Sequence, residues 1–373
     1  MKFGLLFELG GPPGSTREDV KKIYDNALDQ IALADELGFD HMWAVEHHFS
    51  PPHSFSTAPE VFLTAAAVRT KRIRIGHGIV VCTPPVNHPA HIAERAAVLD
   101  IISNGRLDVG TGRSNTWLEL GGYAAEPHDT KQSWDEYVRA LPKMWTDPTY
   151  SNPNGRFFKM PERAIVPHPL QDPHPPLWVA VTSAGTEYDA ADRGLGVFGL
   201  SIGNYKAQEE KISNYRRRIQ NCEPIGPAVN EQVHIVNFMH CGLDETASQR
   251  GRLMLDTFNH NTAHTVPVKE VYPSPLYQIG GFLPTLRQEA LGPGDATGIP
   301  EGLAIGQPDR IIDVVKHWEA IGVDGMNFVI QASEVLSHED VMESLRNFAK
   351  YVMPQFKTPE ELAAPVPTGV RKV

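Results

Sequence analysis

Short apolar segments alternate with longer amphipathic segments along most of the chain. The first apolar segment, residues 3–9 (FGLLFEL), is followed by a stretch in which Ile23, Ala27 and Ile31 recur at helical spacing. The same alternation predicts eight strands, over residues 3–9, 41–48, 73–81, 106–113, 177–183, 196–202, 231–241 and 325–331. It predicts helices near residues 17–37, 58–69, 89–103, 132–145, 186 onward, 205–220, 244–259, 309–321 and 338–352.

Strands that alternate with helices are expected to pair in parallel, because parallel neighbours need a crossover connection. The predicted strands are nearly continuous apolar runs, which is typical of a sheet covered on both faces. Eight such units fit either a closed (β/α)8 barrel or an open doubly wound sheet, and periodicity alone does not choose. No GxGxxG follows the first strand, which weakens the dinucleotide-binding form of the open sheet.

Two stretches interrupt the alternation. Residues 146–176 are rich in Pro and predict a small hairpin around FFKM and AIVPHP. Residues 260–307 are rich in Pro and Gly, and a loop of that length in a compact domain is usually functional or disordered. We interpret this second stretch as an insertion over the barrel mouth, a candidate lid. A plain surface insertion is the alternative.

Bulk properties narrow the function further. The net charge of −11 argues against a surface that binds the phosphate backbone of nucleic acid. No segment approaches about 18 consecutive apolar residues, so we expect no membrane span. The N-terminal segment lacks the features of a signal peptide, and Cys82, Cys222 and Cys241 form no CxxC pair. We therefore expect reduced thiols and a cytoplasmic location.

Histidines end the second predicted strand, at the face where (β/α)8 barrels carry their active sites. The strand ends in Glu46-His47-His48-Phe49, and an imidazole can donate or accept a proton near neutral pH. Successive side chains of a strand point to opposite faces, so only one of His47 and His48 should point into the barrel mouth, and the sequence does not say which. A hydrogen-bonded structural role is the alternative for each.

The fourth and fifth predicted strands end in residues suited to a phosphate group. Arg113 follows Gly-Thr-Gly, so its guanidinium can bind an anion where the backbone approaches closely. The segment from Thr182 to Thr186 opens a helix and supplies backbone N–H groups and the hydroxyls of Ser183 and Thr186. Ordinary N-capping accounts equally for these hydroxyls, and a structural ion pair for Arg113.

Metal and hydrolase chemistry find little support in the sequence. Glu46, His47, His48 and His53 are close together, but no HExxH or CxxC spacing is present. We therefore expect no metal site. No GxSxG is present either, which argues against a nucleophilic hydrolase.

These strand ends, in this order, resemble the bacterial luciferase-like family of flavin-dependent monooxygenases. The matching segments cover nearly the whole chain: MKFG at the start, then residues 37–49, 98–113, 176–194 and 305–324. The resemblance implies a (β/α)8 TIM barrel that forms one domain over residues 1–373. The insertions, about 146–176 and 260–307, would then lie at its C-terminal face.

The resemblance also implies an activity. Reduced FMN, supplied by a separate NAD(P)H-dependent flavin reductase, would react with O2 to give a flavin hydroperoxide that oxygenates a small organic substrate. A homodimer is expected by analogy with the family. Two alternatives stay open: a deazaflavin-dependent hydride-transfer enzyme on the same barrel, and a non-catalytic flavin-binding subunit. The intact EHHF motif argues against the second.

Site residues are carried over by motif. By resemblance, His47 matches the family's catalytic histidine beside the flavin, and Arg113 matches the arginine that contacts the FMN phosphate. The donors to that phosphate match Thr182, Ser183 and Thr186.

Three glycine and isoleucine positions carry further implications of the resemblance. Gly78 and Ile79 fall where the family has a non-proline cis peptide beneath the flavin ring, next to an apparent two-residue insertion. Gly112 stands where light-emitting luciferases have a reactive cysteine, so light emission is not expected.

Aromatic side chains could line a dry pocket around the flavin, which would keep water from the reaction. The sequence offers Phe7, Trp43 and Trp117, together with Tyr277 and Phe282 from the candidate lid. Core packing is the alternative for each of them.

Overall fold

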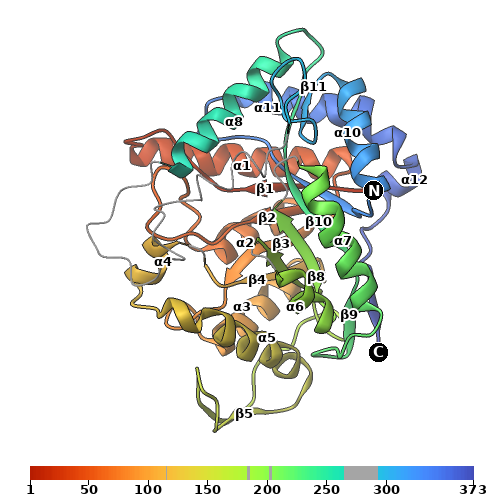
Figure 1. Ribbon diagram of the computed structural model, residues 1–373. Coiled ribbons are helices and arrows are strands. Elements are labelled where there is room, and N and C mark those ends of the chain that lie inside the picture. The colour runs from red at the N-terminus through yellow and green to blue at the C-terminus, as the bar shows by residue number, and fades with distance from the viewer. Residues whose placement is uncertain (115, 183–184, 201–203, 264–292) are drawn as a thin grey trace.

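Eight parallel strands pair edge to edge until the last meets the first, and they form a closed barrel (Figure 1). In this computed structural model the strands run in the order β10-β12-β1-β2-β3-β4-β7-β8, and β8 pairs with β10 to close the ring. Their bounds are β1 (Lys2–Phe7), β2 (His41–Ala44), β3 (Arg74–Val81), β4 (Leu107–Gly112), β7 (Leu177–Val181), β8 (Gly196–Leu200), β10 (Val233–Cys241) and β12 (Gly325–Val329). The predicted (β/α)8 barrel is confirmed, and the open sheet is excluded.

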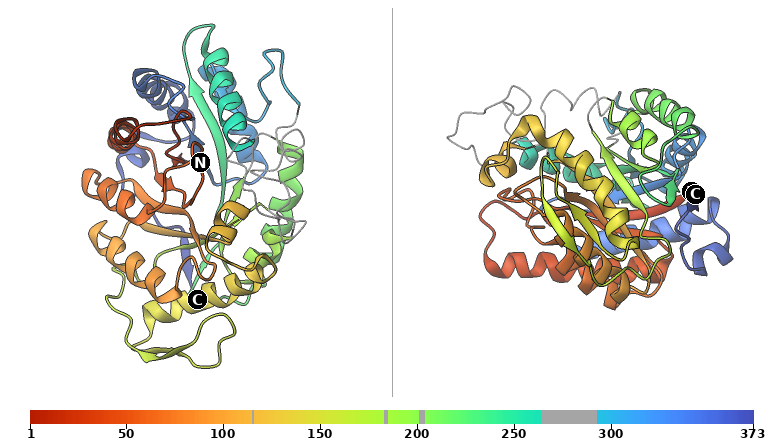
Figure 2. Two further views of the ribbon diagram at one scale, coloured as in Figure 1. Left: turned by 90° about the vertical axis from the view of Figure 1, so that its left-hand side faces the viewer. Right: turned by 90° about the horizontal axis from the view of Figure 1, so that it is seen from below.

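Helices surround the barrel, as both views of Figure 2 show. The structure describes residues 1–114, 116–182, 185–200, 204–263 and 293–373. The main helices are α1 (Arg17–Leu37), α2 (Pro59–Arg69), α3 (Pro89–Ile102), α5 (Thr130–Thr146), α6 (Thr186–Asp192), α7 (Tyr205–Ile219), α8 (Ala247–Ala263), α10 (Pro308–Ala320) and α11 (His338–Asn347). Within those ranges, no helix combines the length and apolarity that crossing a bilayer requires.

Shorter elements complete the chain. They are α4 (Trp117–Gly122), η1 (Pro127–Asp129), η3 (Phe348–Val352), η4 (Met353–Gln355), α12 (Pro359–Ala363), β5 (Tyr150–Asn152), β6 (Met160–Arg163), β9 (Ala228–Asn230), β11 (Ala304–Gly306) and β13 (Val370–Lys372). β11 adds to the edge of β10, and β9 pairs with β13 in a separate antiparallel ribbon.

α1 shows how the sequence sets the ends of a helix. The Thr16 hydroxyl accepts the N–H of Asp19, and the Asp19 carboxylate accepts the N–H of Thr16, which is a capping box. Gly38 ends the helix at a φ of 91°, a conformation that a side chain would strain. The buried face carries the residues whose spacing predicted the helix, Ile23, Ala27, Ile31 and Ala34.

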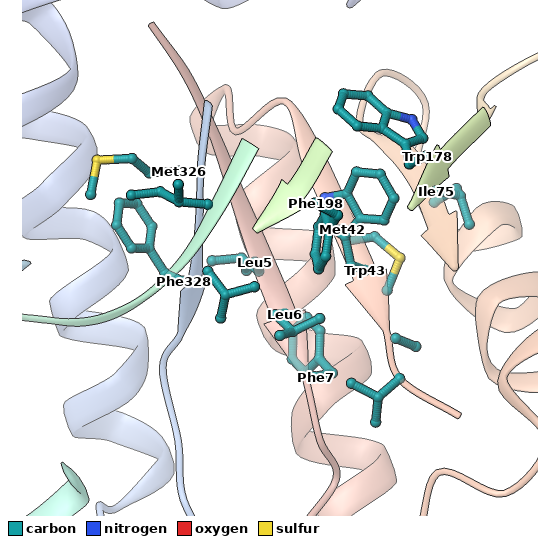
Figure 3. Packing of buried hydrophobic residues seen from close by; sticks show 14 of the residues in the cluster. Leu5, Leu6, Phe7, Met42, Trp43, Ile75, Trp178, Phe198, Met326 and Phe328 are labelled. Atoms are coloured by element: carbon teal, nitrogen blue, oxygen red, sulfur yellow. The ribbon is translucent and has the colours of Figure 1, made fainter. Parts of the chain in front are cut away.

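Large aromatic rings fill the inside of the barrel. The Trp43 ring lies 4.7 Å from Phe198 and 5.6 Å from Trp178 between centroids (Figure 3). Trp43 fits because Gly76 on the neighbouring strand has no side chain: a Cβ there would lie 2.1 Å from the indole. Trp43 is therefore core rather than pocket wall. Phe7 packs outward on Phe62 of α2, so it too belongs to the core.

The two predicted insertions are placed differently by the structure. β5 pairs antiparallel with β6, so the hairpin begins before FFKM and ends before AIVPHP (Figures 1 and 2). The predicted pairing was wrong at this point because the prolines of AIVPHP cannot donate to a ladder. Of the candidate lid, residues 264–292 lie outside the described residues, including Tyr277 and Phe282.

Candidate active site

The strand register brings the EHHF motif and the residue after β1 to one rim of the barrel. Phe7 pairs with Ala44, so the chain leaves β1 and β2 at the same level. Beyond the strands, the N–H of Val45 donates to the Phe7 carbonyl at 3.2 Å, and the N–H of His47 donates to the Ser56 carbonyl at 2.9 Å. This rim is the C-terminal end of the barrel, where the motif was predicted to lie.

His47 is held by a buried carboxylate from α4. Its Nδ1 lies 2.8 Å from Oε1 of Glu119, and the Glu119 side chain is only 1% exposed. The same carboxylate accepts the N–H of His48 at 3.0 Å and the hydroxyl of Ser114. Glu119 is thus fully hydrogen-bonded, and it fixes both the position and the ring orientation of His47.

The surrounding charges favour the protonated form of His47. Burial alone would lower the pKa of His47, but the carboxylates of Glu119, Glu8 and Glu46 raise it to about 9. The pKa of Glu119 is lowered in spite of its burial, because His47 and the hydrogen bonds stabilise the carboxylate. At neutral pH the two groups therefore form an imidazolium–carboxylate pair.

Two further groups face the other side of the His47 ring. Oε2 of Glu8 lies 3.7 Å from Nε2 of His47 and 3.6 Å from Nε2 of His53. Burial raises the pKa of Glu8. Burial and the positive charge of His47 lower the pKa of His53 to about 3. Glu8 and a neutral His53 therefore lie on the side of the ring where His47 carries its Nε2 proton.

His48 has a different environment, which answers the question left by strand parity. Its Nε2 lies 3.1 Å from Oε1 of Glu46, and its Nδ1 lies 3.1 Å from the hydroxyl of Tyr123. Glu46 also accepts the N–H of Val81 at 2.7 Å and the side-chain amide of Asn87 at 2.9 Å. Glu46 and His48 thus tie the end of β2 to β3, while His47 contacts the Glu8–Glu119 cluster.

Arg113 follows β4 on the same rim. The pairing of Thr111 with Val179 places Arg113 level with the end of β7, beside Thr182. The Arg113 carbonyl accepts the Thr83 hydroxyl at 2.9 Å. Its guanidinium has no ion pair or hydrogen bond with any residue that the structure describes. The described residues therefore offer no support for the structural ion pair that was the alternative for Arg113.

α6 begins at Thr186, soon after the end of β7, the strand that pairs with β4. Gly185 is the N-cap at a φ of 84°, and no described side chain caps the helix. The Thr186 hydroxyl is thus not used for capping, in contrast to the alternative drawn from the sequence. Thr182 is exposed and Thr186 is buried. Ser183 lies outside the described residues.

The expected non-proline cis peptide at Gly78–Ile79 is wrong. In the ranges that the structure covers, the cis bonds all precede proline, at Pro52, Pro85, Pro167 and Pro173. A register shift between β3 and β4 lies at these two residues instead, so a bulge takes up the extra length there. Gly78 and Ile79 are the half-exposed residues of a strand that is otherwise buried.

The bulge brings Ile79 against Gly112, the residue before Arg113. The Ile79 side chain leans over β4, where a Cβ on Gly112 would lie 2.5 Å from its Cδ1. A cysteine at position 112 would therefore need Ile79 to move. Trp117, the third predicted pocket aromatic, is half-buried in α4 beside Gly121.

Three residues of this site, Glu8, His53 and Glu119, were not predicted from the strand ends. Glu8 is the one charged residue of the first predicted strand, residues 3–9, and lies near its end, so its position was a usable signal. His53 lies in the loop after EHHF and belongs to no metal motif of regular spacing. Glu119 lies on a helix, 72 residues from His47, and nothing in the sequence pairs the two.

The fold and the rim geometry define a class: (β/α)8-barrel proteins with a ligand site at the carboxyl ends of the strands. Within this class, the chain belongs to the family of luciferase-like monooxygenases, whose family model matches residues 1–325. The resemblance drawn from the strand-end motifs is thereby confirmed.

Known relatives agree with this assignment. The chain is 28% identical over 351 residues to the oxygenase component of flavin-dependent trigonelline monooxygenase from Acinetobacter baylyi, with 92% of each chain covered. It resembles the solved monooxygenase RslO1 from Streptomyces bottropensis with a TM-score of 0.79 and 26% identity, over 96% of this chain and 100% of that one. The oxygenating constituent of 3,6-diketocamphane monooxygenase from Pseudomonas putida, solved with FMN, shares the fold with a TM-score of 0.74 at 18% identity, over 96% and 99%.

Proposed function

We propose that this chain is the oxygenase component of a two-component flavin monooxygenase. It would use reduced FMN and O2 to oxygenate a small organic substrate. The observation that carries the proposal is the buried His47–Glu119 pair, which holds a proton at the C-terminal rim, the end of the barrel at which the flavin would bind. The family assignment and the relative described as an oxygenase component support it.

The residues at the rim fit a flavin phosphate. Arg113 presents a guanidinium without a partner among the described residues, and such a group binds phosphate bidentately. Thr182 and Thr186 follow the adjacent strand and supply hydroxyls, and Ser183 is assigned the same role by its place in the motif. The half-exposed bulge at Gly78 and Ile79 would lie against the flavin ring system.

When bound, the reduced flavin supplies the electrons that activate oxygen. The protein residues would bind, orient and protonate. Because Glu119 occupies Nδ1 of His47, the proton that His47 can deliver or recover is the one on Nε2. Glu8 and His53 lie on that side of the ring and would limit the entry of water.

The same proposal includes two partners. A separate NAD(P)H-dependent flavin reductase would supply the reduced FMN. A second copy of this chain would cover an apolar strip on the outside of α2 and α3, two helices that pack side by side. The exposed apolar residues of this strip are Val61, Val68, Val98, Ile101 and Ile102.

A retention experiment separates the proposal from the deazaflavin alternative. The purified protein is mixed anaerobically with reduced FMN and, in parallel, with a reduced deazaflavin, and each mixture is desalted. We expect retention of reduced FMN. Retention of the deazaflavin alone would favour hydride transfer and would contradict the proposal.

A further inference from the structure

Three potential metal ligands, Glu8, His47 and His53, come from separate segments and meet on the Nε2 side of the His47 ring. Glu8 follows β1, His47 follows β2, and His53 lies in the loop that leads to α2. Their ligand atoms, Oε2 of Glu8 and Nε2 of each histidine, all lie within 4.8 Å of one another. No metal motif of regular spacing encodes this arrangement, so it becomes visible only in the folded chain.

The loop that carries His53 is fixed by the backbone around it. The N–H of Gly11 donates to the Pro52 carbonyl at 3.0 Å, and the N–H of Ser54 donates to the Ser50 carbonyl at 3.0 Å. A Cβ on Gly10 would lie 2.4 Å from the His53 carbonyl, so the close approach of the two loops requires glycine there. His53 is thus pre-positioned toward Glu8.

The spacing of the atoms suits one divalent ion. Zinc binds imidazole nitrogen and carboxylate oxygen at about 2.0–2.2 Å, so tetrahedral ligand atoms lie about 3.4 Å apart. The Glu8–His47 and Glu8–His53 separations are 3.7 and 3.6 Å. Small rotations of the side chains would bring them to the required distance. Two histidines and a carboxylate form a donor set that transition metals prefer.

Two further contacts point to a cation at this position. Oε2 of Glu8 is buried and accepts no hydrogen bond in the described part of the chain, and its contact with Nε2 of His47, at 3.7 Å, is too long for one, so a closer cation or donor would stabilise this oxygen. Glu119 binds Nδ1 of His47 and turns Nε2 toward Glu8. A carboxylate behind a metal-binding histidine is the usual outer support of such sites.

We infer that Glu8, His47 and His53 bind one divalent transition-metal ion, with Glu119 as the outer support and the fourth position open to water. A bound ion would displace the proton from Nε2 of His47 to solvent and take its place, so the metal would reversibly inhibit proton transfer by that residue. The inhibition rests on the proposed function, whereas the binding does not.

Calorimetry with Zn²⁺ on metal-free protein, in the absence of flavin, tests the binding. We expect one ion per chain, and at least tenfold weaker binding in Glu8→Gln and in His53→Gln. Glu119→Gln should weaken binding by about 10–100-fold, since it removes the outer support. The control is His91→Gln, which breaks the surface pair of His88 and His91 and should leave the affinity unchanged. The site would be overturned if the wild type bound no Zn²⁺, or if Glu8→Gln and His53→Gln bound it as tightly as the wild type. Weaker binding in His91→Gln would overturn it as well.

A measurement on the wild-type chain covers the case in which a variant does not fold. Histidine modification by diethyl pyrocarbonate is mapped by mass spectrometry with and without Zn²⁺. The ion should protect His47 and His53 and leave the exposed His91 reactive. Equal modification of His47 and His53 in both samples would overturn the site. If the ion protects both histidines but oxygenase turnover is unaffected by Zn²⁺, the site stands and the role of His47 in proton transfer is rejected.

Discussion

At the scale of single residues, the decisive feature is an imidazolium kept charged inside the protein. A buried histidine usually loses its proton, because burial penalises the charged form. In this chain Glu119 reverses that tendency at 2.8 Å, and Glu8 and Glu46 add to it. A general acid that remains protonated at neutral pH can supply a proton wherever negative charge develops next to Nε2.

The charge pair predicts how stability depends on pH. The pKa of His47 is raised from an ordinary value of about 6.5 in the unfolded chain to about 9. The stabilisation is therefore fully present below about pH 6.5 and is lost as pH rises through about 9. Thermal unfolding of the wild type and of Glu119→Gln, compared from pH 6 to pH 10, should show a stability difference that shrinks across this window. A difference that stays constant would contradict the pairing.

Arg113 predicts an effect on cofactor affinity. Replacing it with alanine removes a charge-assisted contact, so the dissociation constant for reduced FMN should rise at least tenfold, about 1.4 kcal/mol. Arg113→Lys keeps the charge and should lose less. Anaerobic fluorescence titration measures both constants, and an unaltered constant in Arg113→Ala would reject the phosphate role.

At the scale of elements, the barrel depends on glycines that make room for large rings. Gly76→Ala on β3 would place a Cβ 2.1 Å from the Trp43 indole, so we expect a loss of about 1–3 kcal/mol or more in the free energy of unfolding. Gly199→Ala on β8 is the matched control, since the nearest described atom, the His234 carbonyl oxygen, would lie 3.6 Å from its Cβ. Urea unfolding measures both. Equal losses would show that the Trp43 contact is not the cause.

The elements also show what a sequence can predict. Alternation of apolar strands and amphipathic helices predicted a parallel sheet covered by helices, because each strand is buried on both faces and each helix on one. Closure of that sheet into a barrel was predicted only by the resemblance to the luciferase-like family. The hairpin predicted around FFKM and AIVPHP lies earlier in the chain, where β5 pairs with β6, because the prolines of AIVPHP have no N–H to donate to a strand ladder. Arg113 and Thr182 could be placed together from strand order alone. Glu119 could not be placed beside His47 from the sequence, because this contact depends on how the chain turns after β4, where Ser114 adopts a positive φ of 63°.

At the scale of the whole molecule, the apolar strip on α2 and α3 predicts self-association. Val68 is 69% exposed in the single chain, and four more exposed apolar residues lie on the same two helices, which pack side by side. Light scattering after size-exclusion chromatography should give twice the mass of one chain for the wild type. Val68→Glu should shift it toward one chain, while Val373→Glu, which lies outside the strip, should not. A wild-type monomer would contradict the proposed pair.

The proposed role of His47 is to act in oxygen chemistry rather than to hold the rim together. The direct test is oxygen uptake from reduced FMN across a panel of organic substrates, with oxygenated product and hydrogen peroxide both quantified. The wild type should couple uptake to one product. His47→Ala should bind reduced FMN with similar affinity but form that product about 10²–10⁴-fold more slowly and release most of the oxygen as hydrogen peroxide. Unchanged coupling in His47→Ala would contradict the account.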